Sequence, residues 1–122
     1  MTYVRLYADE GGESHFNDRA ATLASADFAP PAPPLEVSTP EAASRFLFLS
    51  APVGWAGEWH PVPRRQWMLY LAGGIEVEAS DGEARRFGPG SVTLVEDTTG
   101  KGHRSRVVGG TAALLAVVQL PD

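Results

Sequence analysis

The sequence predicts an all-β protein. About nine short segments are either alternating or continuously apolar, and turns rich in glycine and proline separate them. No segment repeats its apolar residues at the 3.6-residue period of a helix. Short strands at such close spacing favour a sandwich or a barrel. With 122 residues, the chain is long enough for one domain with a modest core.

Residues 1–44 are predicted to form an N-terminal strand and a proline-rich arm. Residues 2–7 alternate in polarity, which is typical of a strand, and a turn follows at 8–14. Four prolines between residues 28 and 35 cannot donate hydrogen bonds to a sheet, so they favour an extended arm. We expect this arm to lie on the surface of the barrel or on a partner subunit. His15 is either an ordinary exposed side chain or a group that the arm lends to a pocket.

Residues 45–122 are predicted to form the barrel, in a chain that is a single domain overall. The run RFLFLS at 45–50 is apolar on both sides. It is therefore expected to be buried on both sides, one inside the barrel and the other covered by another sheet or subunit. The segment at 57–62 is an irregular edge because prolines interrupt it. Further strands are predicted at 66–71, 75–80, 83–87, 91–96, 103–108 and 111–120.

Glycines and polar residues follow a recognisable spacing in the middle of the chain. The positions that carry it are Gly54, His60, Val62, Gln66 and Gly73, followed by Gly90, Glu96, His103 and Val107. This spacing resembles the two linked motifs of the cupin superfamily, in which the positions of Glu96 and Val107 usually hold proline and asparagine. The resemblance implies a cupin-type jelly-roll β-barrel with a small-molecule pocket inside it. It also implies a homodimer, since cupin domains of this size commonly pair by exchanging strands and arms.

The family's metal-ligand positions are only partly kept. Cupins that bind a divalent ion use His, His, Glu and His, where this chain has His60, Val62, Gln66 and His103. Valine cannot be a ligand, and glutamine offers a neutral amide oxygen in place of a carboxylate. The resemblance therefore implies one of two sites. Either His60, Gln66 and His103 hold a divalent transition metal (Zn, Ni, Mn or Fe), or the pocket is degenerate and binds no metal.

Even without a metal, His60, Gln66 and His103 would form a polar cluster inside an apolar cup, as in many small-molecule sites. A histidine can exchange a proton near pH 7, so these three are the predicted catalytic residues, with Gln66 orienting substrate or water. Glu58 is a candidate orienting group or second base, or else part of a surface salt bridge with Arg64 or Arg65. The predicted ligand-binding residues are Glu58, Trp59, Val62, Met68 and Tyr70. In the following loop, Asp97, Thr98 and Thr99 could touch a ligand at the rim.

These features predict an enzyme of isomerase, cyclase or lyase type. The alternative is a non-catalytic ligand-binding or sensing protein, because so much of the metal-ligand pattern is missing. A net charge of −5 argues against nucleic acid or an anionic membrane surface as a partner. The chain has no cysteine, no apolar run long enough to span a membrane and no visible signal peptide, so we expect a cytoplasmic protein.

Overall fold

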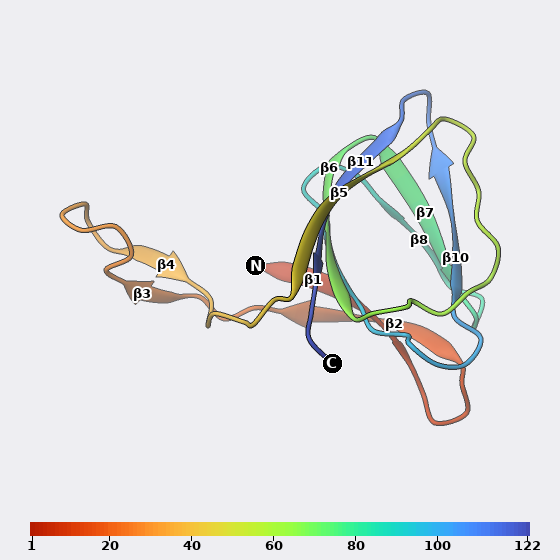
Figure 1. Ribbon diagram of the computed structural model, residues 1–122, viewed down its shortest axis with the longest axis horizontal. Helices are drawn as coiled ribbons and strands as arrows, with labels where there is room; N and C mark the ends of the chain where they lie inside the picture. The colour runs from red at the N-terminus through yellow and green to blue at the C-terminus, as the bar shows by residue number, and fades with distance from the viewer.

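A computed structural model describes residues 1–122, and every regular element in it is a strand (Figure 1). The prediction of an all-β protein is therefore confirmed. There is no helix with the length and hydropathy needed to cross a membrane. The strands are β1 (Thr2–Ala8), β2 (Ser14–Ala20), β3 (Ala24–Ala26), β4 (Leu35–Val37), β5 (Arg45–Ala51), β6 (Gln66–Ala72), β7 (Gly74–Ala79), β8 (Ala84–Phe87), β9 (Val92–Val95), β10 (His103–Val108) and β11 (Ala113–Gln119).

Two sheets form the body of the molecule and curve around a common interior (Figure 1). The larger sheet has six strands in the order β2-β1-β9-β6-β11-β5, and the smaller has three in the order β10-β7-β8. All pairs are antiparallel except β1 and β9, which run parallel with Val4 opposite Thr93. No strand pairing joins the two sheets, so hydrogen bonds do not close them into the predicted barrel.

The core fills the space between the two sheets. Leu115 of β11 is fully buried, and Leu6 of β1 and Ile75 of β7 are at most 5% exposed. They meet because alternate residues of a strand point to the same side of its sheet. Burying each such side chain contributes about 1.5–3 kcal/mol to folding. Many of the core side chains, Leu6 and Ile75 among them, also line a cavity between the two sheets.

The predicted strands occur within one or two residues of their predicted bounds. The segment at 57–62 is irregular, as expected: it forms one isolated bridge to β10, between His60 and His103, and Pro61 cannot donate a hydrogen bond to a sheet. The strand β2 was not expected, since SHFNDRA has too few apolar residues to show a pattern. It pairs with β1, which places Phe16 beside Leu6 in the core.

The strand β5 is less buried in the single chain than its sequence predicts. It forms an edge of the six-stranded sheet, where only β11 pairs with it. Leu49 packs against the core, whereas Phe46 and Phe48 on the opposite side are 58% and 67% exposed. Their rings pack edge to face, 5.0 Å apart. The prediction that both sides are buried is therefore not met by this chain alone.

The proline-rich segment forms an arm that extends away from the two sheets (Figure 1). Its only regular structure is the small hairpin of β3 and β4, with Ser25 opposite Glu36. At the base of the arm, Glu41 accepts a hydrogen bond from Trp67 Nε1, and the Ser44 amide donates to the Gln119 carbonyl. Two large apolar side chains of the arm, Phe28 and Leu35, are exposed.

Candidate functional site

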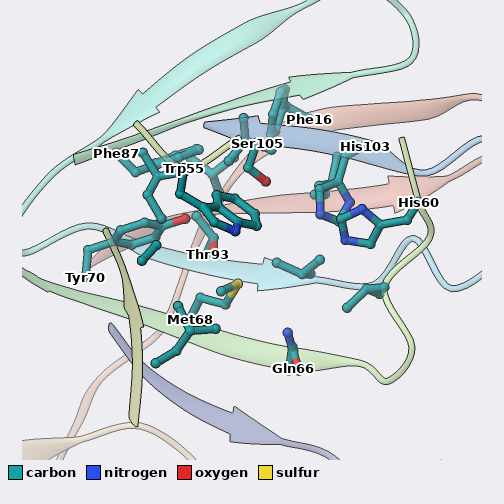
Figure 2. A pocket seen from close by; sticks show the side chains of 18 of the residues that line it. Phe16, Trp55, His60, Gln66, Met68, Tyr70, Phe87, Thr93, His103 and Ser105 are labelled. Atoms are coloured by element: carbon teal, nitrogen blue, oxygen red, sulfur yellow. The ribbon is translucent and has the colours of Figure 1, made fainter. Parts of the chain in front are cut away.

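A cavity of about 390 Å³ lies between the two sheets (Figure 2). This volume is within the range of small-molecule sites, roughly 300–1,000 Å³. Its walls are mainly apolar, and no Lys, Arg, Asp or Glu lines it. Tyr70 and Phe87 stack at 5.5 Å to form one flat wall, with Phe16 tilted against Phe87 at 6.2 Å. The polar residues of the lining include His60, Gln66, Thr93, His103 and Ser105.

A buried carboxylate–imidazole pair lies at one side of this cavity, with His103 in the lining and Asp97 behind it. His103 opens β10, and its Nδ1 lies 2.6 Å from Oδ2 of Asp97, which follows β9 by two residues. Asp97 has no exposed surface, and His103 is 8% exposed. A carboxylate only accepts hydrogen bonds, so the ring donates from Nδ1 and leaves Nε2 as its free nitrogen. Asp97 thereby fixes both the tautomer and the orientation of His103.

His60 stands beside His103 at the exposed side of the cavity. The two rings are 4.8 Å apart between centroids, and Figure 2 shows them side by side. Each residue's amide donates to the other's carbonyl at 3.0 Å, which holds the two backbones together. His60 Nδ1 lies 2.7 Å from the Glu58 carbonyl oxygen, so this ring also donates from Nδ1. Both histidines therefore keep Nε2 available for a ligand.

The close approach of these two backbones requires a glycine before His103. Gly102 has a φ of +73°, and a Cβ at this position would overlap the carbonyl group of His60. Only glycine adopts this conformation at low cost and leaves room for the neighbouring chain. The residue therefore sets the relative position of the two imidazoles.

The remaining predicted ligand positions are not grouped with the histidines. Val62 lines the cavity as a buried apolar side chain. Gln66 also lines it, but Figure 2 shows its amide set apart from the two rings, and Oε1 accepts a hydrogen bond from Gln119 at 3.4 Å. The chain contains no group of three His, Cys, Asp or Glu side chains that could hold a metal ion. Of the three residues in the metal site that the resemblance implies as one alternative, only His60 and His103 lie together, so the residues present do not fit that site.

The predicted ligand-binding residues fall into two groups. Met68 and Tyr70 line the cavity, together with Val62. Trp59 instead lies on the surface under the Arg104 guanidinium, and Trp55 takes a place in the cavity lining. Glu58 contacts His60 through its main-chain carbonyl, and its side chain makes no salt bridge with Arg64 or Arg65.

His15 lies outside the cavity, in an ion-pair cluster on the surface. Its Nε2 is 2.7 Å from Asp9, and its Nδ1 is 3.0 Å from Asp81. The hydrogen bond that the ring donates to Asp9, reinforced by the one to Asp81, raises the pKa of His15 above 6.5. The adjacent residue, Phe16, is the one that points into the cavity. His15 thus ties the β1–β2 turn to the β7–β8 turn.

A pair of hydroxyls lies in the interior of the cavity. Burial raises the pKa of Tyr70 to about 12, and the nearby Thr93 hydroxyl moderates this rise. The Tyr70 phenol is therefore a neutral hydrogen-bond donor at physiological pH. Thr93 is 3% exposed, and its Oγ1 makes no hydrogen bond of good geometry. An unsatisfied buried hydroxyl costs free energy unless a ligand or water pairs with it.

Thr93 and the burial of Asp97 were not expected from the sequence, although a signal for both was present. Thr93, Val95 and Asp97 are spaced two residues apart, and Val95 belongs to the core. Extending that alternation in both directions places Thr93 and Asp97 on the inner side of the sheet. The sequence instead suggests that Asp97 lies on a rim loop, because glycines and threonines follow it.

Glu96, which stands where the family usually has proline, joins three parts of the chain. Its carboxylate accepts hydrogen bonds from Arg5 Nε and Arg65 Nε, each at 2.6 Å. Burial opposes ionisation of Glu96, but the two arginines outweigh it and lower its pKa below 4.5. The carboxylate thus ties β1 and the segment before β6 to the end of β9, next to Asp97.

Comparison with known proteins does not assign a family. No protein-family profile matches the chain, and no curated protein matches it. Among solved structures, the protein NMB1881 from Neisseria meningitidis is similar with a TM-score of 0.46 and 18% identity, over 68% of this chain and 83% of that one. The conserved SPY1581 protein of unknown function from Streptococcus pyogenes has a TM-score of 0.45 and 22% identity, over 63% of this chain and 64% of that one.

Proposed function

We propose that this protein is a small cupin-type jelly roll whose cavity binds a small molecule and catalyses proton transfer on it. One observation carries the proposal: the buried Asp97–His103 pair presents a free Nε2 to a largely apolar cavity. The cupin assignment is supported by the spacing of the two motifs and by the two facing sheets, since jelly rolls are built from two sheets.

The chemistry follows from the orientation of the imidazoles. His103 Nε2 removes a proton from a C–H or O–H group of the substrate, and Asp97 stabilises the imidazolium that forms. The proton then returns to another atom of the same substrate, either from His103 or by way of His60 beside it. Such a cycle is redox-neutral and describes an isomerase, and the same first step serves a cyclase or a lyase. No step passes through a metal, because the donors present do not fit one.

A test that needs no knowledge of the substrate uses the proton transfer itself. We would follow deuterium exchange at C1 of 2-tetralone in D2O by proton NMR. A positioned base can accelerate proton transfer by about 10²–10⁴-fold. The expected result here is exchange at least about tenfold faster than in buffer. His103→Ala should abolish the gain and Asp97→Asn should reduce it. Asp81→Asn is the matched control because Asp81 pairs with a histidine outside the cavity.

Two results would contradict the proposal. Exchange no faster than in buffer, or a gain that survives His103→Ala, would remove the catalytic role of this pair. The alternative of a non-catalytic ligand-binding or sensing protein would then be favoured, since the cavity itself does not depend on catalysis.

The proposal includes a homodimer. The outer side of β5 exposes Phe46 and Phe48, and Leu71 and Leu114 are exposed on the strands β6 and β11 of the same sheet. A sheet that is apolar on both sides needs a cover on both sides. Five of the six strands are seven residues long and β9 has four. With strands about 4.8 Å apart, they span roughly 600 Å², compared with the 800 Å² that each partner buries in a standard interface. The exposed apolar arm starts from the same sheet and can add to this area.

A further inference from the structure

Among the polar residues that line the cavity, His60 with His103 and Thr93 with Tyr70 form two separate clusters, and their separation describes the ligand. This inference rests on the proposed function, because it concerns the same cavity. Figure 2 shows His60 and His103 on one side of the cavity and Tyr70 and Phe87 on the other, with Thr93 between them. Along β6, Gln66 and Tyr70 both line the cavity and their Cα atoms are about 13 Å apart.

The two clusters differ in what they offer. At the first, the free Nε2 atoms of His60 and His103 accept a proton or a hydrogen bond. At the second, the neutral Tyr70 hydroxyl donates. The Thr93 hydroxyl, which is buried near the Tyr70 hydroxyl and makes no hydrogen bond of good geometry, can donate or accept. A matching ligand therefore has an O–H or acidic C–H at one end and a carbonyl or hydroxyl at the other.

The charge and shape of the cavity restrict the ligand further. Since no Lys or Arg lines the cavity, a carboxylate or phosphate would be buried without a counter-charge, which is costly. The stacked rings of Tyr70 and Phe87 offer a flat apolar face, which suits a planar ring better than a branched chain. A cavity of about 390 Å³ has room for more than a single ring with its substituents.

We infer that the ligand is an uncharged, flat molecule the size of a fused two-ring compound, with a proton donor facing His60 and His103 and a hydrogen-bonding oxygen facing Thr93 and Tyr70. The Thr93 hydroxyl is then a specificity-determining group. Its place in β9, between strands on both sides, holds it rigidly toward the ligand.

The test compares three probes by titration calorimetry: 2-naphthol, 6-acetyl-2-naphthol and 6-hydroxy-2-naphthoate. The acetyl compound should bind about 3–10-fold more tightly than 2-naphthol, which lacks the second oxygen, because one additional hydrogen bond forms. It should bind at least about tenfold more tightly than the naphthoate, whose charge would be unpaired. Thr93→Val keeps the shape of the side chain and should erase most of the advantage over 2-naphthol. Tyr70→Phe, which removes only the phenol oxygen, provides a second variant.

Each opposite result overturns the inference. These are equal affinity for the acetyl compound and 2-naphthol, tightest binding of the naphthoate, no effect of either substitution, or no binding of any probe. The proton-exchange experiment is read separately. Selective probe binding without exchange would support the ligand class and refute the catalytic role. Exchange without selectivity for the acetyl oxygen would support the catalytic role and refute the ligand class.

Discussion

The Nδ1 of His103 and the Oδ2 of Asp97 are 2.6 Å apart, and both residues are buried at the side of a mainly apolar cavity. Because the carboxylate can only accept, it selects one tautomer of the imidazole and leaves the opposite nitrogen for the ligand. The second oxygen of Asp97 is buried without a hydrogen bond. The geometry of the Asp97–His103 pair is therefore sensitive to the residues packed around it.

We expect Asp97→Asn to change the tautomer of His103. The amide can donate to Nδ1, which favours a proton on Nε2 and withdraws the lone pair from the cavity. Long-range ¹⁵N–¹H correlation spectra, recorded where the ring is uncharged, distinguish the two forms. His60 is the internal control, since its Nδ1 bonds to the Glu58 carbonyl and should keep its proton there. An unchanged His103 tautomer in the variant would show that Asp97 does not orient the ring.

Removing the Glu96 carboxylate should destabilise the fold. We expect Glu96→Gln to lower the free energy of unfolding at pH 7 by about 1–3 kcal/mol, because charge-assisted hydrogen bonds to Arg5 and Arg65 are weakened. The folded-state pKa of Glu96 is lowered, so its stabilisation is present above pH 4.5 and is lost as the pH falls through the lowered pKa. Urea unfolding at several pH values measures both effects.

The control for this substitution is Glu78→Gln. Glu78 pairs with Arg104 on the surface, and such exposed pairs contribute less than about 1 kcal/mol. An equal cost for the two substitutions would mean that the burial of Glu96 is unimportant. A cost of Glu96→Gln that stays constant down to the lowest pH would contradict the assigned ionisation.

His15 should stabilise the fold in a pH-dependent way. Its pKa is raised first by Asp9 and then by Asp81, so its stabilisation is complete below pH 6.5 and is lost as the pH rises through the raised pKa. We expect His15→Ala to destabilise the protein clearly more at pH 5.5 than at pH 9, measured by chemical unfolding. Asp81→Asn, which removes one of the two partners, should show a smaller effect of the same sign. A variant whose loss of stability is the same at both pH values would refute this assignment.

Metal content provides another test. Catalytic zinc sites have three protein ligands and structural ones four, whereas this cavity offers two imidazoles. We expect the purified, untagged protein to contain well under one Mn, Fe, Co, Ni, Cu or Zn per chain by elemental analysis. Added Zn should bind weakly and only while His60 is present, so His60→Ala is the matched control. Close to one metal per chain, lost in this variant, would show that Gln66 or another group completes a site.

The oligomeric state should depend on the exposed side of β5. We expect a dimer at micromolar concentration by sedimentation velocity, and a shift toward monomer in the double variant Phe46→Ser and Phe48→Ser. Val53→Ser is the control, since Val53 is 57% exposed but lies beyond β5 in a loop. A wild-type protein that sediments as a monomer would contradict the dimer, as would a dimer unaffected by the double substitution.

Most strands could be predicted because one side of each faces a core and the other does not. Alternation identifies β7, and continuous apolar runs identify β6 and β11 as strands. The strand β2 could not be recognised, because Ser14 and Phe16 alone give no pattern. Pairing partners were also hidden, since the parallel contact of β1 with β9 depends on residues about 90 positions apart.

The candidate site could be predicted only in part. Motif spacing located His60 and His103, whose rings lie together. The spacing does not show how far an amide is from an imidazole across a cavity, so the separation of Gln66 from the histidines was not visible. The role of Asp97 depends on a loop conformation that buries it, which the composition of that loop does not reveal.

The position of β11 has a consequence for synthesis of the protein. β11 is the last strand along the chain, yet it lies between β5 and β6, and it is the only partner of β5. On a ribosome, the aromatic strand β5 must therefore wait until residues 113–119 have emerged. At about 5–20 residues per second this delay is roughly 3–14 s. During this delay, the nascent chain exposes an unpaired strand with two phenylalanines. Chaperones bind segments of this kind, and without a chaperone such segments promote aggregation.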